Sequence, residues 1–415
     1  MDYELTETQR EIAALSREIA VRKIKPVREH YDVTEEFPWP IVEELRKADL
    51  FGVYLPEAYG GLAGGAFELV LVTEQISRAC AGIALSVVGS SLCGIPILLF
   101  GDKEQRERWL PDLGSGKRIG AFALTEPQAG SDATATKCSA RLDGDHYVIN
   151  GSKNFCSNGS AAEIYTFFAT TNPARGARGI SAFVVEKGTP GFSFGKKEHK
   201  MGIRASWTYD LVFENCRIPK KNLLYKEGYG LFVAQNTFDL SRPGVAAQAL
   251  GIAQGALDET MSYIRVRKQF GQAISSFQAI QHMLADCGTA IESSRALLYT
   301  TSKAIDKSIL PAIAAAVEKG TIAFDEMNRL EVKRWTKESG MCKVMCSDTA
   351  MKVAVDCVQM CGGIGYMRDF PVEKYMSDAK ITQIYEGTNQ IQRNEIAAMM
   401  IKEAASKAKE QPLAA

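Results

Sequence analysis

Between residues 121 and 227 the sequence pattern changes from helical to extended, and this change most constrains the possible fold. Short runs rich in β-branched and aromatic residues follow one another there: AFALTE, ARLDGDHYVING, YTFFATT, ISAFVVE and TYDLVFENCRIP. Turn text such as Asn150-Gly151 and Thr189-Pro190-Gly191 separates the runs. Residues 1–120 and 228–405 have helical patterns, and 406–415 resembles a frayed tail. The order predicts an α+β fold, with a β domain of sandwich or barrel size between two helical domains.

The same order argues against the common nucleotide-binding folds. Strands do not alternate with helices, no Walker A loop is present, and no GxGxxG follows a strand. Nucleotide binding by a Rossmann or P-loop fold is therefore not expected.

Residues 79–101 contain no charged side chain, and by length alone this run would allow a membrane span. The run is rich in Ser and Gly and contains Pro96, and Asp102-Lys103-Glu104 starts a new helix directly after it. We interpret it as a buried helix that lines an internal cavity, and we expect no membrane span.

Charge and cysteine content exclude further classes of protein. Lys plus Arg and Asp plus Glu each number 49, so no excess of positive charge favours nucleic-acid binding. The ten cysteines are scattered through apolar text, and no signal peptide is expected after Met1. We therefore expect free, buried thiols in the cytoplasm. Cys342 and Cys346, and likewise Cys357 and Cys361, are spaced four residues apart, but the four histidines lie far from them in the sequence. No metal site is therefore predicted.

Several stretches, in this order and spacing, resemble the acyl-CoA dehydrogenase family: LTEPQAGSD at 124–132, RVRKQFGQ at 265–272 with QMCGGIGY at 359–366, and IYEGTNQIQR at 384–393. The resemblance covers residues 1 to about 402. It implies an N-terminal helical domain (1–120), a central antiparallel β domain (121–227) and a C-terminal four-helix bundle (228–405). It also implies a homotetramer, bound FAD, α,β-dehydrogenation of an acyl-CoA thioester, and electron transfer to electron-transfer flavoprotein.

The resemblance places the catalytic base at Glu386, the position used by the short-chain, medium-chain and butyryl-type members. The base would remove the α-proton while a hydride leaves the β-carbon for flavin N5. A dry cavity raises the pKa of a carboxylate toward its working range. A second branch of the family carries its base where Ser241 stands here, and a serine cannot serve as base, which sharpens the assignment to Glu386.

The flavin contacts implied by the resemblance fall in two groups. The isoalloxazine ring is expected against Phe122, Leu124, Thr125, Gly130, Ser131, Phe155 and Ser157. Phe155-Cys156 stands where the family has Trp-Ile, while Ser157 keeps a hydroxyl for flavin N5. The ADP part of FAD, held across a subunit interface, is expected against Arg267, Phe270, Phe277, Gln278, Gln359, Gly362 and Gly363. Thr388, Asn389 and Gln390, just after Glu386, match further flavin contacts of the family.

Substrate contacts carried over from the family are Ser131, Asp239, Arg242 and Gly387, with Ser90 and Ser91 in the acyl-cavity wall. Small residues in 83–98 would leave room for a bulky, branched or aryl acyl group. No Lys or Arg occurs between 79 and 102, which counts against glutaryl-CoA-type decarboxylation.

Two departures from the family pattern concern Trp207, where a small or polar residue is usual, and residues 306–336, a helical insertion into a normally short connection. A similar insertion occurs in dehydrogenases of anaerobic aromatic degradation, which makes benzylsuccinyl-CoA a candidate substrate.

Other functions stay open at this point. A short-chain, butyryl-type dehydrogenase fits the same base position. A flavin oxidase or monooxygenase of the same fold is disfavoured, because acyl-CoA oxidases are longer chains and nitroalkane-oxidising relatives carry Asp at the position of Glu386. A DNA-associated relative would require a basic surface. A non-catalytic interaction protein would be expected to lack Glu386.

Overall fold

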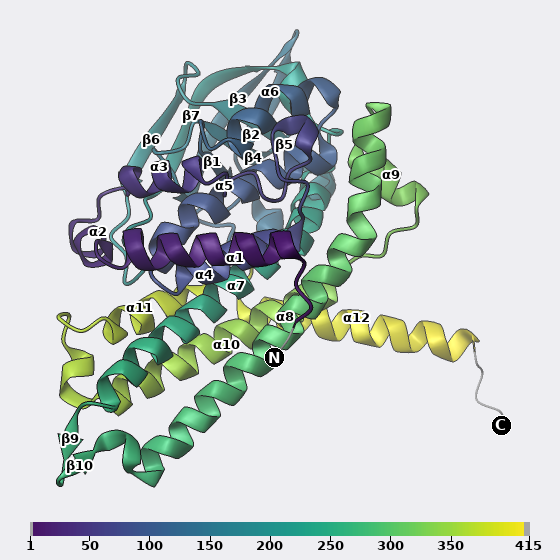
Figure 1. Cartoon of the computed structure of the whole chain (residues 1–415). Helices are drawn as coiled ribbons and strands as arrows, with labels where there is room; N and C mark the ends of the chain where they lie inside the picture. The colour runs from purple at the N-terminus through teal and green to yellow at the C-terminus, as the bar shows by residue number, and fades with distance from the viewer. Residues whose placement is uncertain (1–2, 411–415) are drawn as a thin grey trace.

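The computed structural model describes residues 3–410, with only the backbone of residues 407–410. Two helical domains lie on either side of a sheet domain in chain order, and Figure 1 shows the sheet and N-terminal helices at one end of the molecule and the C-terminal bundle at the other. The predicted α+β fold is confirmed.

The N-terminal domain consists of helices packed around one buried helix. α1 begins at a capping box in which Thr6 and Gln9 exchange hydrogen bonds, and α6 begins at a second capping box formed by Asp102 and Gln105. The helices are α1 (Glu7–Ile19), α2 (Arg28–Thr34), α3 (Trp39–Lys47), α4 (Ala66–Ser77), α5 (Ala81–Phe100) and α6 (Lys103–Gly114), with a π-helical turn at Ala20–Ile24.

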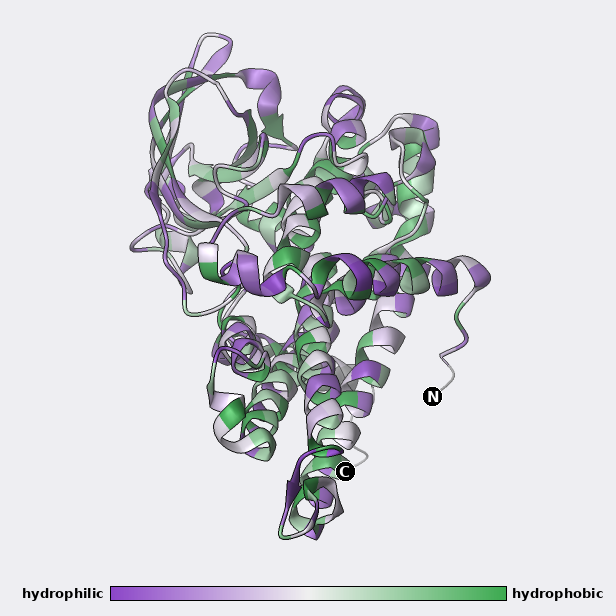
Figure 2. Cartoon of the chain, turned by 60° about the vertical axis from the view of Figure 1, so that its left-hand side comes forward, coloured by the Kyte–Doolittle hydropathy of each residue, from purple (hydrophilic) through white to green (hydrophobic). Residues whose placement is uncertain are grey.

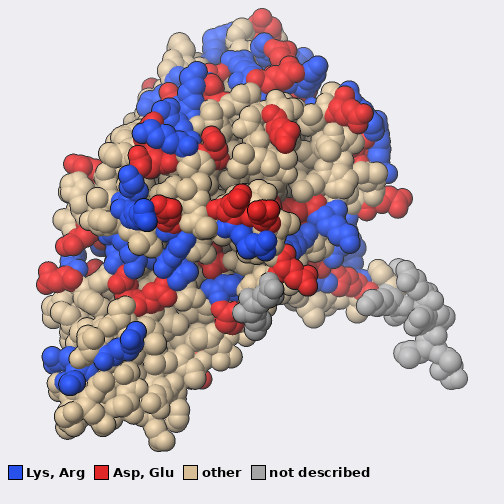
Figure 3. Space-filling view, viewed as in Figure 1, with Lys and Arg blue, Asp and Glu red and all other residues tan. Residues whose placement is uncertain are grey.

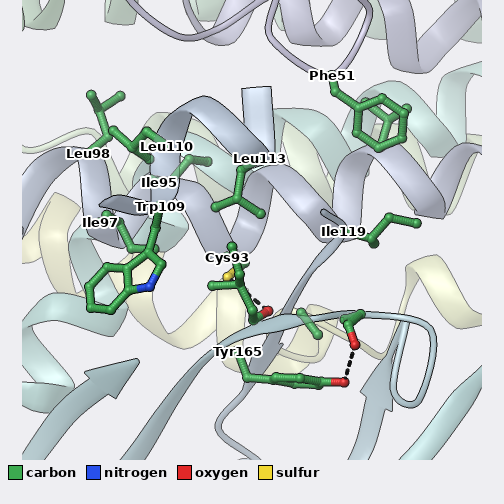
Figure 4. Packing of buried hydrophobic residues seen from close by; sticks show 14 of the residues in the cluster. Phe51, Cys93, Ile95, Ile97, Leu98, Trp109, Leu110, Leu113, Ile119 and Tyr165 are labelled. Carbon is green, nitrogen blue, oxygen red and sulfur yellow. Dashed lines mark hydrogen bonds between the residues drawn. The ribbon is translucent and has the colours of Figure 1, made fainter. Parts of the chain in front are cut away.

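The uncharged run of the sequence forms α5, which lies inside the protein. Among residues 3–410, α5 is the one helix that is long and apolar enough to cross a membrane, and 94% of its most apolar window is buried within the fold. Figure 4 shows α5 residues packed against α6 and the sheet; the labelled side chains include Cys93, Ile95, Ile97, Leu98, Trp109, Leu110, Leu113 and Tyr165. The buried-helix interpretation is confirmed.

The central domain is an eight-stranded sheet in the order β6-β7-β3-β2-β4-β5-β8, with β1 beside β4. The strands are β1 (Gly120–Ala123), β2 (Ser139–Asp143), β3 (His146–Ser157), β4 (Ile164–Thr170), β5 (Ile180–Glu186), β6 (Phe192–Lys197), β7 (Thr208–Pro219) and β8 (Leu223–Leu224). Most neighbours are antiparallel, as expected, but β1 runs parallel to β4 and β2 meets β4 in one parallel pair. Because β1 also contacts α5, the segment after β1 lies at the domain boundary.

The C-terminal domain is a bundle in which α10 contacts α7, α8, α11 and α12. Its helices are α7 (Gly230–Ile264), α8 (Gln278–Lys319), α9 (Ala323–Arg329), α10 (Thr336–Cys361), α11 (Val372–Thr382) and α12 (Asn389–Glu410). A hairpin of β9 (Lys268–Gln269) and β10 (Gln272–Ala273) joins α7 to α8. In Figure 2 this hairpin lies at the tip of the bundle, opposite the sheet.

Residues 306–336 extend α8 to Lys319 and then form α9 and the turn before α10. Phe324 of α9 stacks on Phe100 of α5, with 5.0 Å between ring centroids, and also contacts Phe232 of α7. The insertion therefore packs on both helices that border the domain junction. At the other end of the chain, α12 continues through 406–410, where Ala, Lys and Glu favour helix, and 411–415 of the predicted tail lie outside the described residues.

Trp207 and the cysteines have structural positions in the fold. Trp207 donates from Nε1 to the carbonyl oxygen of Glu35 at 2.9 Å and packs on Phe37, which joins the sheet to the N-terminal domain. All ten cysteines are buried and free, as predicted.

Candidate active site

A cavity of about 350 Å³ opens where the three domains meet. Three parts of the chain form most of its wall: the inner face of α5, the first half of α7 and the turn that carries Glu386 before α12. The ends of β1 and β3 complete it with the loop 130–134. The cavity therefore depends on all three domains, and no single domain contains it.

The α5 side of the cavity is lined by apolar residues. Leu85, Val88, Gly89 and Leu92 follow the helical spacing that places residues on one face. Ser90 and Ser91, predicted to line the acyl cavity, lie outside the set of lining residues. The Ser90 hydroxyl accepts a hydrogen bond from Gly120 N at 3.0 Å, and Ser91 Oγ donates to Val88 O at 2.8 Å. Both hydroxyls thus hydrogen-bond within the fold.

Glu386 lies in the cavity wall on a left-handed turn. Its φ is +52° and that of Gly387 is +93°, a combination for which glycine is well suited at the second position. Ser241 Oγ of α7 donates to Glu386 Oε2 at 2.7 Å, so the side chain at the alternative base position contacts the carboxylate directly. Arg242 Nε and Gln392 Nε2 each donate to the Glu386 carbonyl oxygen at 3.4 Å. These contacts orient the turn toward the cavity.

The electrostatics of Glu386 combine opposing effects. Burial raises the pKa of its carboxyl above the ordinary value, and the Ser241 hydrogen bond and the charges of Arg242 and Lys343 act in the opposite direction. A carboxylate in this setting is a stronger base than an exposed one, yet it keeps partners that stabilise the ionised form. These are the properties that proton removal from carbon requires.

A buried ion pair holds the wall that follows β1. Lys153 Nζ of β3 donates to Glu126 Oε1 at 2.6 Å and to Leu124 O at 3.1 Å, and both charged side chains are almost fully buried. The Glu126 carboxylate also accepts from the backbone N–H groups of Lys137 and Cys138, at 2.7 and 3.1 Å. Burial lowers the pKa of Lys153, and the Glu126 carboxylate opposes this shift. The pair fixes the carbonyl of Leu124 at the cavity edge.

The end of β3 presents Phe155 and Ser157 to the same cavity. The register against β7 shifts between Lys153 and Cys156, and a β-bulge of this kind redirects side chains. Phe155 has a φ of +57° and is 63% exposed, whereas Cys156 is buried. The Oδ1 atom of Asn154, which also lines the cavity, is buried and has no hydrogen-bond partner. This edge therefore has a free acceptor and an aromatic face.

The structure brings one group of the predicted site residues into this cavity: Phe122, Leu124, Thr125, Gly130, Ser131, Phe155, Ser157, Arg242, Glu386 and Gly387. Asp239 is not among the lining residues. Its carboxylate instead accepts from Arg334 Nε and Thr336 Oγ1, both at 2.8 Å, so it anchors the end of the insertion to α7. Of the predicted residues after Glu386, Thr388 directly precedes α12, Asn389 begins it, and Gln390 is exposed.

A second group of predicted residues lies elsewhere in the chain. Arg267, Phe270, Phe277 and Gln278 belong to the β9–β10 hairpin and the start of α8, and Gln359, Gly362 and Gly363 end α10. Figure 1 shows the hairpin at the far end of the bundle from the sheet. None of these residues lines the cavity, and Phe270 is 94% exposed.

Sequence reasoning missed several residues of the site. Phe238 and Val245 of α7, Tyr385 before Glu386, and Glu395 of α12 all line the cavity. Arg242 forms an ion pair with Glu395 at 2.9 Å and lies over the Phe238 ring. Helical spacing from Arg242 predicts the position of the two α7 residues, but nothing in the local sequence pairs α7 with α12. Among residues 3–410 no group of three or more His, Cys, Asp or Glu side chains gathers as a metal site would.

Comparison with known proteins agrees with this geometry. Three family models match: the acyl-CoA dehydrogenase N-terminal domain over residues 6–117, the middle domain over 121–216 and the C-terminal domain over 228–401. The chain belongs to the acyl-CoA dehydrogenase family.

Individual relatives cover almost the whole chain. The short-chain specific acyl-CoA dehydrogenase of Clostridium acetobutylicum is 41% identical over 395 residues, which is 95% of this chain and 98% of the relative. A chain from the solved structure of the electron transferring flavoprotein of Acidaminococcus fermentans, described for flavin-based electron bifurcation, is 42% identical with a TM-score of 0.88, covering 96% of this chain and 99% of that one. Acyl-CoA dehydrogenase complexed with FAD from Bacillus anthracis has a TM-score of 0.88 and 30% identity, covering 99% of this chain and 70% of that one.

Proposed function

We propose that this chain is an FAD-dependent dehydrogenase of a short-chain acyl-CoA and that Glu386 is its catalytic base. The observation that carries the proposal is the position of the Glu386 carboxylate. It shares one cavity with Leu124, Thr125, Phe155 and Ser157, the residues of the flavin-type wall.

The chemistry at Glu386 is a proton transfer from carbon. The carboxylate accepts the α-proton of the thioester, the electron pair of that C–H bond forms the new α,β double bond, and the β-carbon loses a hydride. FAD supplies the hydride acceptor when it is bound. Glu386 must be ionised to act, and Ser241 and Arg242 support the ionised form through a hydrogen bond and a positive charge.

The residues present fit an isoalloxazine ring. The backbone after β1 and the hydroxyls of Thr125 and Ser157 offer polar contacts at the cavity edge, and Phe155 offers an aromatic face. The unpartnered Oδ1 of Asn154 is a further acceptor at the same edge. The Lys153–Glu126 pair would hold this wall in place beside the ring.

An apolar, short acyl group fits the cavity best. The α5 face offers only Leu85, Val88, Gly89 and Leu92. The charged residues that line the cavity are Asp132, Arg242, Glu386 and Glu395, and the one cation among them is already paired with Glu395. No free cation there supports the distal carboxylate of benzylsuccinyl-CoA, so the short-chain substrate is preferred. The similarity of this chain to the short-chain specific acyl-CoA dehydrogenase of Clostridium acetobutylicum also supports a short-chain substrate.

A homotetramer would complete the FAD site, because the second group of predicted residues cannot reach this cavity within one chain. Large apolar side chains near those residues are exposed: Val266, Phe270, Tyr366 and Met367. Figure 3 shows one face of the C-terminal bundle that is largely uncharged, in contrast to the mixed charges above it. Arg267 and Gln359 to Gly363 of a neighbouring copy would then hold the ADP part of FAD.

For the electron acceptor we propose electron-transfer flavoprotein, supported by the similarity to a chain solved in a study of that protein. The ten free, buried thiols agree with a cytoplasmic location.

Anaerobic mixing of the purified protein with a panel of acyl-CoAs tests the proposal. The protein is expected to contain FAD and to lose its oxidised-flavin absorbance with butyryl-CoA. Branched, cyclic, aryl and dicarboxylic acyl-CoAs serve as comparisons. Unchanged absorbance with every acyl-CoA would exclude the proposed dehydrogenation, and reduction by the dicarboxylic member alone would exclude the short-chain assignment.

A further inference from the structure

Lys343 is a fully buried lysine of α10 that lies behind the base-bearing turn. Its Nζ donates to the carbonyl oxygen of Gly387 at 2.9 Å and to Asn389 Oδ1 at 2.8 Å. These two acceptors lie one and three residues after Glu386. The ammonium group thus ties the turn that carries the base to the core of the bundle.

Lys343 differs from the other buried lysines in its charge partners. Lys153 contacts Glu126 at 2.6 Å, and Lys374 contacts Asp378 at 2.5 Å. Among the described residues, no carboxylate lies within ion-pair distance of Lys343 Nζ. Burial of a cation without a bonded carboxylate is costly.

The neighbouring charges are already paired with one another. Arg242 of α7 pairs with Glu395 of α12 at 2.9 Å, and Arg393 of α12 pairs with Asp348 of α10 at 2.6 Å. The α5 residues that line the cavity carry no charge, and Tyr385 donates its hydroxyl to Gln248. Within the described residues, neither Glu386 nor Lys343 forms an ion pair, so the charged atoms of both lack a bonded partner of opposite charge.

We propose that Lys343 is a positioning residue for Glu386, which holds the Glu386–Gly387 backbone in place and keeps the base ionised in the dry cavity. The proposal rests on the proposed role of Glu386 as base. Lys343 touches neither substrate nor flavin, and it acts through the carboxylate and the turn that carries it.

The titration of both groups agrees with this geometry. Burial lowers the pKa of Lys343 to about 7, with Arg242 and Arg393 acting in the same direction and Glu386 and Asp348 opposing it. Burial raises the pKa of Glu386, and the positive charge of Lys343 opposes that rise. Each ion therefore stabilises the other, and the two groups titrate as a coupled pair.

Lys343→Met removes the charge while it keeps the length and apolar stem of the side chain. Without the cation, burial dominates and the carboxylate protonates at higher pH. We expect kcat/KM with butyryl-CoA to fall about tenfold on the acid side of the wild-type midpoint and the loss to shrink as the pH rises past the midpoint of the variant. Lys343→Gln, also neutral but with an amide donor, should show the same shift. Lys343→Arg keeps the charge, and its pH midpoint should stay near that of the wild type.

The experiment compares the pH profiles of kcat/KM for these four proteins, with thermal unfolding to show that each variant is folded. Infrared pH-difference spectra follow the carboxyl band that disappears in Glu386→Gln, so the midpoint of Glu386 is measured without turnover. An upward shift in both neutral variants supports the proposal. Midpoints equal to the wild type in Lys343→Met and Lys343→Gln would overturn it, even if activity fell uniformly. Absence of wild-type turnover would count against the proposed function alone, because the infrared midpoint still tests Lys343.

Discussion

Among single residues, the proposed site depends on the carboxylate of Glu386, whose pKa is shifted in opposite directions by its surroundings. Burial raises the pKa of Glu386, while Ser241, Arg242 and Lys343 favour its ionised form. If Glu386 is the proposed base, it acts only when ionised, so activity should be present above this pKa and be lost as the pH falls through it. The direction of the shift gives a pH dependence that an exposed glutamate would not produce.

The first prediction concerns the wild-type pH profile. kcat/KM with butyryl-CoA should decline on the acid side with a midpoint above the ordinary pKa of glutamate, because burial raises the pKa of Glu386. Steady-state kinetics across the acid range measures the midpoint. A midpoint at or below the ordinary value for glutamate would contradict this account of the site.

The second prediction concerns Ser241. In Ser241→Ala the 2.7 Å hydrogen bond to Glu386 Oε2 is absent, so the carboxylate loses a partner of its ionised form. The acid midpoint should move upward, with about a two- to tenfold loss of kcat/KM below it. Ser91→Ala is the matched control, because its hydroxyl donates to Val88 O and does not line the cavity. Equal midpoints in the two variants would show that Ser241 does not tune the base.

The sequence motifs identified candidate site residues, but they did not show which of these side chains face the cavity. Glu386, Thr125 and Ser157 were predicted from motif text, and the structure places them in one cavity. Ser90 and Ser91 fall on other faces of α5, which a list of small residues does not reveal. Lys343 was not predicted, because its contacts with the base-bearing turn are made only after the bundle has folded.

At the scale of secondary-structure elements, the flavin-type wall depends on how β1 and β3 are joined. Lys153 of β3 reaches across to Glu126 and Leu124, which follow β1. The order of helices and strands could be predicted from the periodicity of apolar residues and from the turn-forming residues between strands. The parallel pairing of β1 with β4 did not, because it joins segments separated by two other strands and is set by packing against α5.

The third prediction uses this pair. Lys153→Met leaves the Glu126 carboxylate buried without its cation and should lower the free energy of unfolding by about 3–5 kcal/mol. Lys196→Met is the control, because the 3.0 Å contact of Lys196 with Glu198 is solvent-exposed on the lysine side and should contribute less than about 1 kcal/mol. Denaturant unfolding measures both. Similar small losses in the two variants would show that the buried pair does not stabilise the wall.

At the scale of the whole molecule, three domains build one cavity, and a second set of predicted cofactor residues lies at the far end of the bundle. The fold class was predictable because each domain has its own periodicity. The separation of the two sets was not visible in the sequence, since it follows from the direction in which α7 and α10 leave the cavity. The proposed FAD site shared between copies would bring both sets of residues to one cofactor.

The fourth prediction tests this arrangement. Arg267→Glu places a negative charge where the pyrophosphate would bind and should lower the bound FAD, the oligomer size, or both. Arg217→Glu is the control, an exposed arginine of β7 that pairs with Asp143 away from both residue sets. Flavin absorbance and light scattering measure the two quantities. Full FAD content in an intact oligomer of Arg267→Glu would exclude a shared site that uses this residue.

If Glu386 removes the α-proton, flavin reduction by butyryl-CoA under anaerobic conditions should differ sharply between the wild type and Glu386→Gln. Both proteins should contain FAD, because Glu386 contributes no predicted flavin contact. The wild type should bleach rapidly, and the variant about 10²–10⁴-fold more slowly, as expected for the loss of a positioned base. Bleaching of Glu386→Gln at nearly the wild-type rate would show that another group removes the proton.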